Sequence, residues 1–155
     1  MKSKKWAVFV VSFVVVFAIA YIGSLFTSSA VQSSWYQEIK PALTPPNYVF
    51  PIVWNILFLL IALSLAFSWI NSKNKGEKRS VMIVFGINLI LNALWSVLYF
   101  GFKQQLWAFF DIILILISII YMIAITRKID RKSAWMLVPY LVWVSFAALL
   151  NFLSI

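Results

Sequence analysis

The sequence predicts an all-α integral membrane protein: a single domain, 1–155, built as a bundle of five transmembrane helices. Two features of the composition lead to this prediction, since 64% of the 155 residues are hydrophobic and only 11% are charged. Soluble domains average roughly 45–50% apolar and about 25% charged residues. A chain of this length cannot hide so much apolar surface from water, because its surface is large relative to its volume. Lipid is therefore the expected solvent.

Five apolar segments have the length of about 20 residues that a helix needs to cross a hydrocarbon core about 30 Å thick. They are Trp6–Phe26, Tyr48–Ile70, Ser80–Phe100, Leu106–Thr126 and Ala134–Leu153. Asp111 is the one charged residue within them. The segments lack the alternating polarity of membrane strands, and backbone groups in lipid must pair within their own segment. Each segment is therefore expected to be a helix.

The distribution of lysine and arginine predicts the orientation. Three lysines precede the first segment, and four basic residues lie in each of the connections 71–79 and 127–133. Lys40 and Lys103 are the two basic residues expected on the other side. This excess of eleven to two places the N-terminus in the cytoplasm, and the C-terminus and the long 27–47 connection outside. Clusters of this kind also argue against nucleic-acid binding, despite the net charge of +9.

The N-terminus has an alternative interpretation as a cleavable signal peptide. Lys2–Lys5, an apolar stretch and Ala18–Ala20 together resemble such a peptide. The apolar stretch continues through Phe26, however, and is longer than a typical signal core. We therefore expect a first transmembrane helix that is retained.

The reactive side chains are few. The chain has no cysteine and no histidine, which excludes disulfides, thiol chemistry and nearly all zinc or copper sites, so no metal site is expected. Asp111 is an intramembrane carboxylate, but there is no second buried acid with which it could form an acid–base pair. We expect a structural role for Asp111. The chain is rich in aromatic side chains, with eight Trp, six Tyr and fourteen Phe.

Polar and aromatic residues share one face of the third segment, at i, i+4, i+7 and i+11: Asn88, Asn92, Trp95 and Tyr99. Amides in lipid need partners, so this face should turn into the bundle. One interpretation is that the asparagines bond neighbouring helices, which we favour for Asn88. The other is that the face forms the wall of a ligand pocket.

The second and fifth segments carry similar faces. Trp54 and Phe58 are one helical turn apart, and Trp143, Ala147 and Asn151 repeat at i, i+4 and i+8. Trp143 lies near the middle of its segment, so anchoring at the membrane interface does not explain it. The small Ala147 beside it leaves room either for a flat ligand or for a neighbouring helix.

The 27–47 connection contains Pro41, Pro45 and Pro46, and we expect it to be stiff and extended. It is either an interfacial loop anchored by Trp35 and Tyr36 or a rigid lid over a cavity.

In their order and spacing, these residues resemble the TspO/MBR family of translocator and tryptophan-rich sensory proteins. The resemblance rests on the segment from Trp35 to Trp54, the face Asn88–Trp95 and the segment Pro139–Asn151. It implies a five-helix bundle, often a homodimer, with a pocket under the first connection. Family members bind porphyrins such as protoporphyrin IX and benzodiazepine-site ligands. Some have been linked to sterol transport or to light-dependent oxidative breakdown of the porphyrin.

The resemblance also implies a set of site residues. Those that match the family's pocket are Tyr36, Pro45, Trp54, Phe58, Asn92, Trp95, Trp143 and Ala147. Asn88 joins them as a candidate from the shared face, and Trp54 and Trp143 match the pair associated with porphyrin chemistry. Leu43 stands where the family usually has Trp. The C-terminal residues 150–155 lack the Tyr and basic residue of the family's sterol motif, which makes sterol binding there doubtful.

The primary hypothesis is a membrane receptor that holds a porphyrin as its ligand and requires no cofactor. Its expected partners are membrane lipid and a second copy of the chain. A second hypothesis is enzyme-like photo-oxidation of the bound porphyrin, with Trp54 and Trp143 as the catalytic residues. The remaining alternatives are lipid or sterol transport and a purely structural role for the aromatic residues.

Overall fold

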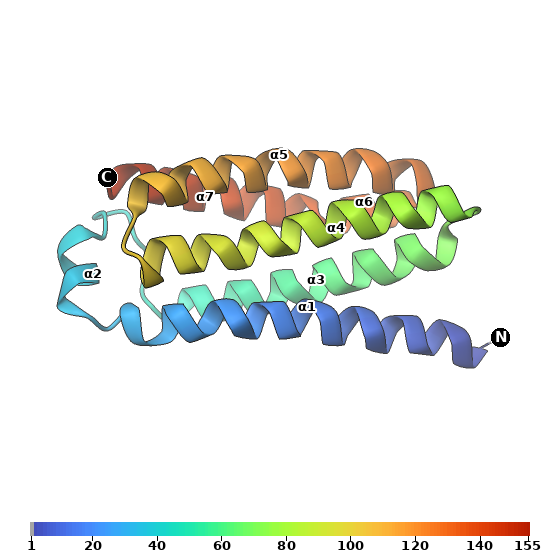
Figure 1. Ribbon diagram of the computed structural model, residues 1–155, viewed down its shortest axis with the longest axis horizontal. Coiled ribbons are helices and arrows are strands. Elements are labelled where there is room, and N and C mark those ends of the chain that lie inside the picture. Colours follow the sequence, from blue (N-terminus) through green and yellow to red (C-terminus); the bar gives the residue numbers. More distant parts are fainter. Residues whose placement is uncertain (1) are drawn as a thin grey trace.

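The computed structural model describes residues 2–155 and confirms the all-α prediction (Figure 1). Five of its units are long and apolar enough to cross a membrane. The elements are α1 (Lys2–Ala30), α2 (Ser34–Ile39), α3 (Val49–Asn71), α4 (Lys75–Ser96), the π-helical turn η1 (Val97–Gly101), α5 (Gln105–Ile129), α6 (Arg131–Met136) and α7 (Val138–Leu153). The five units are α1, α3, α4 with η1, α5, and α6 with α7.

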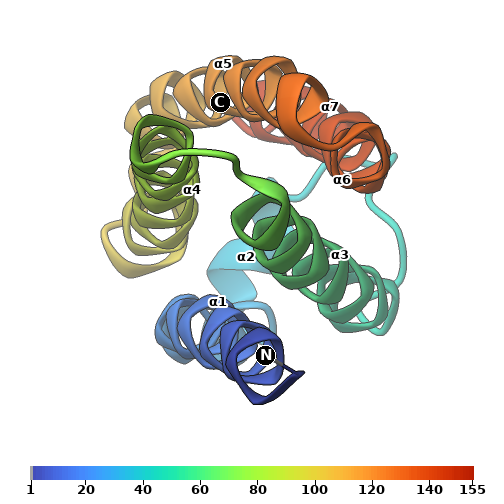
Figure 2. The ribbon, with the colours of Figure 1, turned by 90° about the vertical axis from the view of Figure 1, so that its right-hand side faces the viewer.

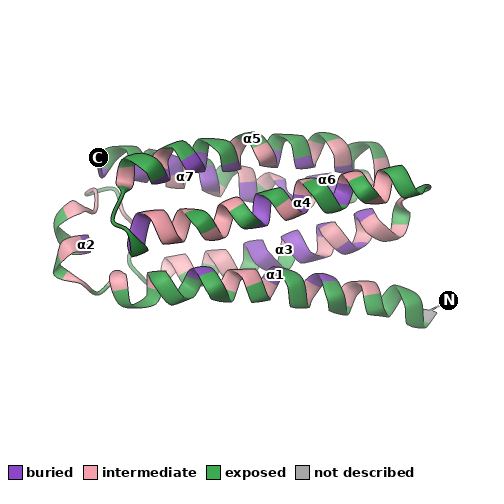
Figure 3. Cartoon of the chain, viewed as in Figure 1, coloured by how far each residue is buried: buried purple, intermediate pink, exposed green. Residues whose placement is uncertain are grey.

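Seen end-on, the long helices form a ring in the order α1, α3, α6–α7, α5 and α4 (Figure 2). Exposed residues cover the outer faces of the ring (Figure 3), and many of them are large and apolar, among them Val14, Ile90 and Ile120. Such a surface suits lipid, because lipid tails are as apolar as the side chains that they contact.

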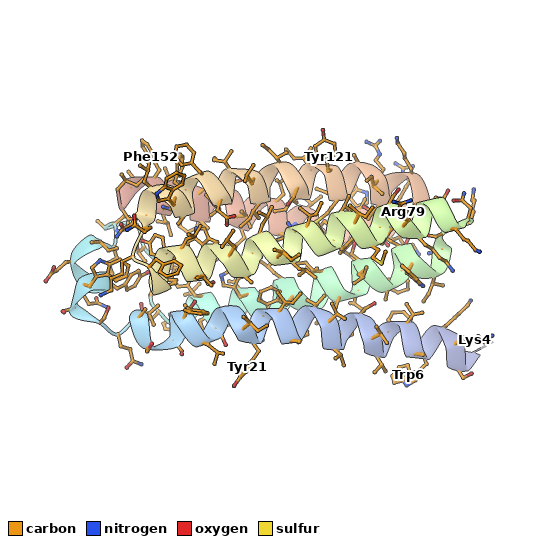
Figure 4. The ribbon with its side chains drawn as sticks, viewed as in Figure 1. Lys4, Trp6, Tyr21, Arg79, Tyr121 and Phe152 are labelled. Carbon is orange, nitrogen blue, oxygen red and sulfur yellow. The ribbon has the colours of Figure 1, made fainter. Side chains whose placement is uncertain are left out.

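The two ends of the bundle differ in charge. Residues 2–5, 72–79 and 127–132 lie at one end, which we call the basic end; Lys4 and Arg79 mark it in Figure 4. Residues 31–48, the turn 102–104 and the C-terminus lie at the other, which we call the loop end. The connections predicted to share one side of the membrane therefore do lie at the same end of the bundle.

Local sequence explains where several helices begin. Asn74 caps α4 by accepting a hydrogen bond from the Glu77 amide at 2.9 Å, and Glu77 Oε2 accepts one from the Lys73 amide at 2.6 Å. The arrangement is similar to a capping box, except that Glu77 accepts from the residue before the N-cap and not from the N-cap itself. Pro51 lies in the first turn of α3, where a missing N–H costs little.

The first connection is more ordered than predicted. We expected it to be extended, but α1 continues to Ala30 and Ser34–Ile39 forms α2. The prolines at 41, 45 and 46 all follow α2, so they do not oppose it, and Ser33 caps it by accepting from the Tyr36 amide. The prediction of extended chain is wrong for 27–30 and 34–39. Residues 40–48 are free of helix, as expected.

The tightest packing lies toward the basic end. Six large side chains with at most 1% exposure form the core there: Ile61, Val81, Phe85, Ile119, Met122 and Leu137. A hydrogen bond from Ser64 Oγ to the carbonyl oxygen of Ser133, at 2.9 Å, joins α3 to the start of the last unit. The fifth unit is interrupted at Leu137, just before Pro139, so α6 and α7 follow one another as two short helices. α3 packs closely on α6 but makes little contact with α7, and the bundle opens toward the loop end.

Candidate ligand-binding site

A cavity of about 790 Å³ lies in the loop-end half of the bundle. Its walls come from α1, the first connection, α3, α4, η1, α5 and α7. Ligand pockets are typically about 300–1,000 Å³ and mostly apolar, with a few polar groups. The cavity has both the size and the composition of a binding site for a small molecule.

Seven residues predicted for the site line this cavity: Tyr36, Trp54, Phe58, Asn92, Trp95, Trp143 and Ala147. They come from α2, α3, α4 and α7, segments far apart in the sequence. The helical faces predicted from spacing alone therefore do turn inward and meet around one volume. Tyr99 and Asn151, which share two of those faces, also line the cavity.

Two predicted residues lie elsewhere. Pro45 is not part of the lining, because the loop turns Pro41 and Thr44 toward the cavity instead. Asn88 is fully buried between helices, one turn from Asn92 on the side of the basic end. Its amide nitrogen donates to Ser118 Oγ at 2.8 Å, and its amide oxygen accepts from Tyr140 Oη at 3.0 Å. Asn88 thus has the bridging role favoured for it from the sequence and is not part of the cavity lining, because both of its amide groups are used to join α4 to α5 and α7.

Aromatic rings form the apolar wall. Trp54 stacks on Phe58 with ring centroids 5.3 Å apart and an interplanar angle of 27°. On the α7 side, Phe50 meets Trp143 edge to face at 5.8 Å. Trp95 stacks on Tyr99 at 4.9 Å. Flat faces and edges are thus presented from three helices, which suits a flat π-system.

A network of side-chain hydrogen bonds holds the polar wall. Asn92 Nδ2 donates to Tyr140 Oη at 3.0 Å, and Tyr140 in turn donates to Asn88. In the other direction along α4, Trp95 Nε1 donates to Asn151 Oδ1 at 2.9 Å, and Asn151 Nδ2 donates to the Gln105 carbonyl at 2.9 Å. Because their partners sit on other helices, Asn92 and Trp95 are held in one orientation. The wall is therefore organised before any ligand binds.

Three buried polar groups near this region have no hydrogen-bond partner among the described residues. They are the hydroxyl of Thr44, the indole N–H of Trp143 and the carboxylate of Asp111, whose residue is only 4% exposed. Buried polar groups are usually paired, so each of these is an exception that calls for an explanation. Thr44 and Trp143 are part of the lining, whereas Asp111 is not. An unpaired donor on a lining residue is consistent with a partner supplied from outside the chain.

The short helix α2 closes the loop end of the cavity. Tyr36 is 6% exposed and packs on Phe100 with ring centroids 5.7 Å apart, while Trp35 meets Tyr99 at 6.1 Å. Lys103 Nζ lies 5.2 Å from the centroid of the Trp35 ring, a cation–π contact. Burial, and then the neighbouring Tyr99, raise the pKa of Tyr36 to about 12. Its hydroxyl is therefore neutral at physiological pH.

The mouth of the cavity faces the flank between α1 and α3. The lining residues that are exposed all come from α1, the first connection or the start of α3, and they include Tyr21, Ser24, Pro51 and Asn55. Tyr21 points away from the bundle in Figure 4. On the opposite side of α1, the gap is closed by tight packing, since a Cβ added at Gly23 would lie 3.3 Å from Ser96 Oγ. The opening therefore extends along the flank between α1 and α3, and the first connection borders it at the loop end.

Comparison with known proteins identifies the family of the chain. A model of the TspO/MBR family matches residues 10–154. The chain belongs to the TspO/MBR family. It is 39% identical over 144 residues to the tryptophan-rich protein TspO of Archaeoglobus fulgidus, an alignment that covers 92% of each chain. It is 37% identical over 137 residues to that of Chlorobaculum tepidum, covering 87% of this chain and 85% of the relative.

A more distant relative is the translocator protein of Ovis aries. It is 30% identical over 122 residues, which cover 76% of this chain and 71% of the relative. Family membership together with the five apolar helical units establishes a multi-pass integral membrane protein. The family resemblance read from the sequence is thereby confirmed.

Sequence reasoning missed several residues of this TspO/MBR site. Tyr140 is the centre of the polar network, although the sequence presents it only as one aromatic residue among many. The hydroxyl residues Ser24, Thr27 and Ser28 of α1 line the cavity near its mouth. Their concentration at the loop end of an otherwise apolar segment was a usable signal. Gly23, beside these residues, makes a close helix contact instead, since an added Cβ would lie 3.3 Å from Ser96 Oγ.

Proposed function

We propose that the protein is a membrane receptor that binds a porphyrin, or a similar flat tetrapyrrole, in the loop-end cavity. The observation that carries this proposal is the placement of Trp54 and Trp143 on the lining of a single cavity of about 790 Å³. An aromatic contact contributes about 0.5–1.5 kcal/mol beyond burial of apolar area. Two indoles together with Phe58 give a planar ligand several such contacts.

Polar groups complement the centre and the edge of such a ligand. The Asn92 side chain is oriented by its bond to Tyr140, and its carbonyl oxygen remains available to a pyrrole N–H. The unpaired indole N–H of Trp143 supplies a donor for an acceptor atom on the ligand. The propionates of a porphyrin would be directed to the mouth or to Lys40 in the first connection, because burying carboxylates is expensive.

The lateral mouth supports a hydrophobic ligand that is taken from the membrane. The exposed lining residues Tyr21, Ser24, Pro51 and Asn55 belong to the two membrane-spanning helices α1 and α3, so part of the opening lies on the flank of the bundle. A ligand dissolved in lipid can reach such an opening without crossing the first connection. We therefore propose that the ligand exchanges with the membrane rather than with water.

Titration with protoporphyrin IX in nanodiscs tests the proposal, with the absorbance of the porphyrin as the readout. Trp54→Phe plus Trp143→Phe should weaken binding by about 5- to 100-fold, as expected from the loss of two indole contacts. Trp107→Phe plus Trp135→Phe is the matched control, because these two indoles are 62% and 68% exposed and lie outside the cavity. Equal affinity of the two double variants would refute the porphyrin site.

A second candidate function is light- and oxygen-dependent breakdown of the bound porphyrin, with dioxygen as the oxidant. The presence of two tryptophans on one cavity favours it, because an indole next to an excited porphyrin can donate an electron. Illumination of the complex in air should then convert the porphyrin to a distinct product, at a rate that Trp54→Phe and Trp143→Phe alter. If bound and free porphyrin bleach alike, the protein is a receptor alone.

A further inference from the structure

A second, smaller cleft lies at the basic end, far from the porphyrin site. It has a volume of about 190 Å³ and lies between the last two turns of α5 and the start of the fifth unit. Its lining is Ile123, Arg127, Arg131, Ala134, Trp135 and Val138. On α5, Ile123 and Arg127 are one turn apart, and the other four residues repeat at i, i+3, i+4 and i+7. The cleft is thus the seam between two facing helical faces.

The cleft is graded from charged to apolar along the membrane normal. Arg127 and Arg131 are exposed lining residues near the ends of their helices, whereas Ile123 and Val138 lie one to two turns deeper and are half-buried. Trp135, beside them, is 68% exposed on the outer surface of the bundle. Tryptophan is enriched at the boundary between headgroups and acyl chains. This order matches the order of the parts of a phospholipid.

One acidic side chain, that of Asp130, lies in the same segment as the two arginines. The chain has four acids: Glu38 lies at the loop end, Glu77 takes part in the cap of α4, and Asp111 is in the loop-end half. The fourth, Asp130, accepts hydrogen bonds from the Lys132 amide at 3.2 Å and from Ser133 Oγ at 2.7 Å.

Through those hydrogen bonds the Asp130 side chain caps the start of α6. Burial alone would raise the pKa of its carboxyl, but the hydrogen bonds from Ser133 and the backbone lower it below the usual value. Asp130 is therefore ionised, and its single negative charge stands against four positive ones in residues 127–132. The segment keeps a net charge of +3, and the rim of the cleft remains attractive to an anion.

The other basic turn of the bundle has the same charge balance, with Lys73, Lys75, Lys78 and Arg79 against Glu77, but none of its residues lines the cleft. In the α3–α4 connection, Lys78 Nζ lies 5.6 Å from the centroid of the Trp69 ring, and the Lys73 amide is paired with Glu77. The described cleft at the basic end is lined by arginine, whose planar guanidinium binds phosphate oxygens in pairs, as lysine does not. A volume of about 190 Å³ is below the usual range for a whole small molecule. It suits a headgroup phosphate whose acyl chains remain in the membrane.

We propose that this cleft is a binding site for an anionic phospholipid of the leaflet at the basic end. The phosphate lies between Arg127 and Arg131, and an acyl chain runs along Ile123 and Val138 beside Trp135. Basic pockets between transmembrane helices are known to hold anionic headgroups in this way. The site is independent of the loop-end cavity and of its ligand.

Native mass spectrometry in detergent, with dioleoylphosphatidylglycerol or dioleoylphosphatidylcholine added, tests the site. Arg127→Gln plus Arg131→Gln should weaken phosphatidylglycerol binding by more than about tenfold, because charge-assisted hydrogen bonds are lost. Lys128→Gln plus Lys132→Gln removes the same charge from the same segment, but from residues that do not line the cleft. This control should weaken binding by about threefold or less, because it removes only long-range attraction. Phosphatidylcholine should bind weakly to all variants.

Equal losses in the two double variants would overturn the site, since the attraction would then be spread over the whole turn. Inorganic phosphate alone should not raise the melting temperature; if it stabilises the protein as much as phosphatidylglycerol does, the ligand is free phosphate and not lipid. If the glutamine variant does not fold, Arg127→Lys plus Arg131→Lys decides the matter. That variant keeps the charge and loses the paired hydrogen bonds, so it should still bind phosphatidylglycerol several-fold more weakly than wild type. Unchanged binding would contradict the proposal.

Discussion

The two halves of the bundle are made from the same five units, yet they are packed differently. In the half toward the basic end, residues such as Phe85, Ile119 and Leu137 are at most 1% exposed and fill the space between helices. In the half toward the loop end, the helices surround a cavity of about 790 Å³. Lipid covers the outside of both halves, so the surrounding solvent does not account for the difference.

Side-chain amides and an indole make cross-helix hydrogen bonds in the open half, whereas hydroxyls supply the bonds of the packed half. In the packed half, Thr126 Oγ1 donates to the Met122 carbonyl of its own helix at 2.7 Å, and Ser64 Oγ donates to the Ser133 carbonyl of a neighbouring helix at 2.9 Å. In the open half, Trp95 and Asn92 donate to side chains on other helices. Bonds within one helix need no particular neighbour, whereas bonds between helices fix how far apart they stand. The cross-helix amides therefore hold the cavity open while the apolar core closes the other end.

The largest effect is expected from a truncation in the packed half. Ile119 is fully buried, and Ile119→Ala should lower the free energy of unfolding by about 2–4 kcal/mol, because the rigid surroundings leave a cavity. Ile120→Ala is the matched control, since Ile120 is 57% exposed to lipid and should change little. Unfolding in mixed micelles measures both. Similar losses in the two variants would mean that the basic-end half is not the rigid part.

A larger side chain in the open half should reduce ligand binding without reducing stability. Ala147→Leu adds three carbons to the cavity wall and should weaken protoporphyrin IX binding by about tenfold or more. The melting temperature should be unchanged or slightly higher, because the added side chain occupies empty space. Ala148→Leu, on a residue that is 7% exposed and lies in the core, should destabilise the protein instead. Thermal unfolding and porphyrin titration on both variants separate ligand loss from misfolding.

A smaller effect is expected at the junction of the two halves. Tyr140→Phe removes the hydroxyl that joins Asn92 to Asn88 and should cost about 1 kcal/mol of stability. Because Asn92 then loses its orientation, porphyrin binding should also weaken by a few-fold. Tyr121→Phe is the control, since Tyr121 is 62% exposed and points away from the bundle (Figure 4). An unchanged affinity in Tyr140→Phe would show that the network does not position the site.

The smallest effect concerns Asp111. Its carboxylate oxygens are buried without a partner among the described residues, so Asp111→Leu should remove no hydrogen bond. We expect a change within about 0.5 kcal/mol of zero, or a gain, because an unpaired buried polar group is unfavourable. The melting temperature in detergent checks this. A loss of several degrees would show that Asp111 has a partner supplied by water, lipid or ligand.

Much of this organisation was predictable from the sequence by local rules. Apolar length predicted the five transmembrane units, and helical spacing predicted that Asn92, Trp95, Trp143 and Ala147 turn inward. Both predictions depend only on the geometry of a single helix in lipid, so the residues of each segment are sufficient to make them. Family membership followed from the order of the same motifs along the chain.

Other features were decided only by the tertiary structure. Asn88 and Asn92 share one helical face, and only the approach of Tyr140 and Ser118 separates a bridging amide from a cavity wall. The helix α2 depends on η1 as the surface against which Tyr36 packs. The arginine cleft depends on how α5 meets α6. In each case the outcome depends on the distance between helices. That distance is set by packing between segments far apart in the sequence, so the sequence of one segment alone does not predict it.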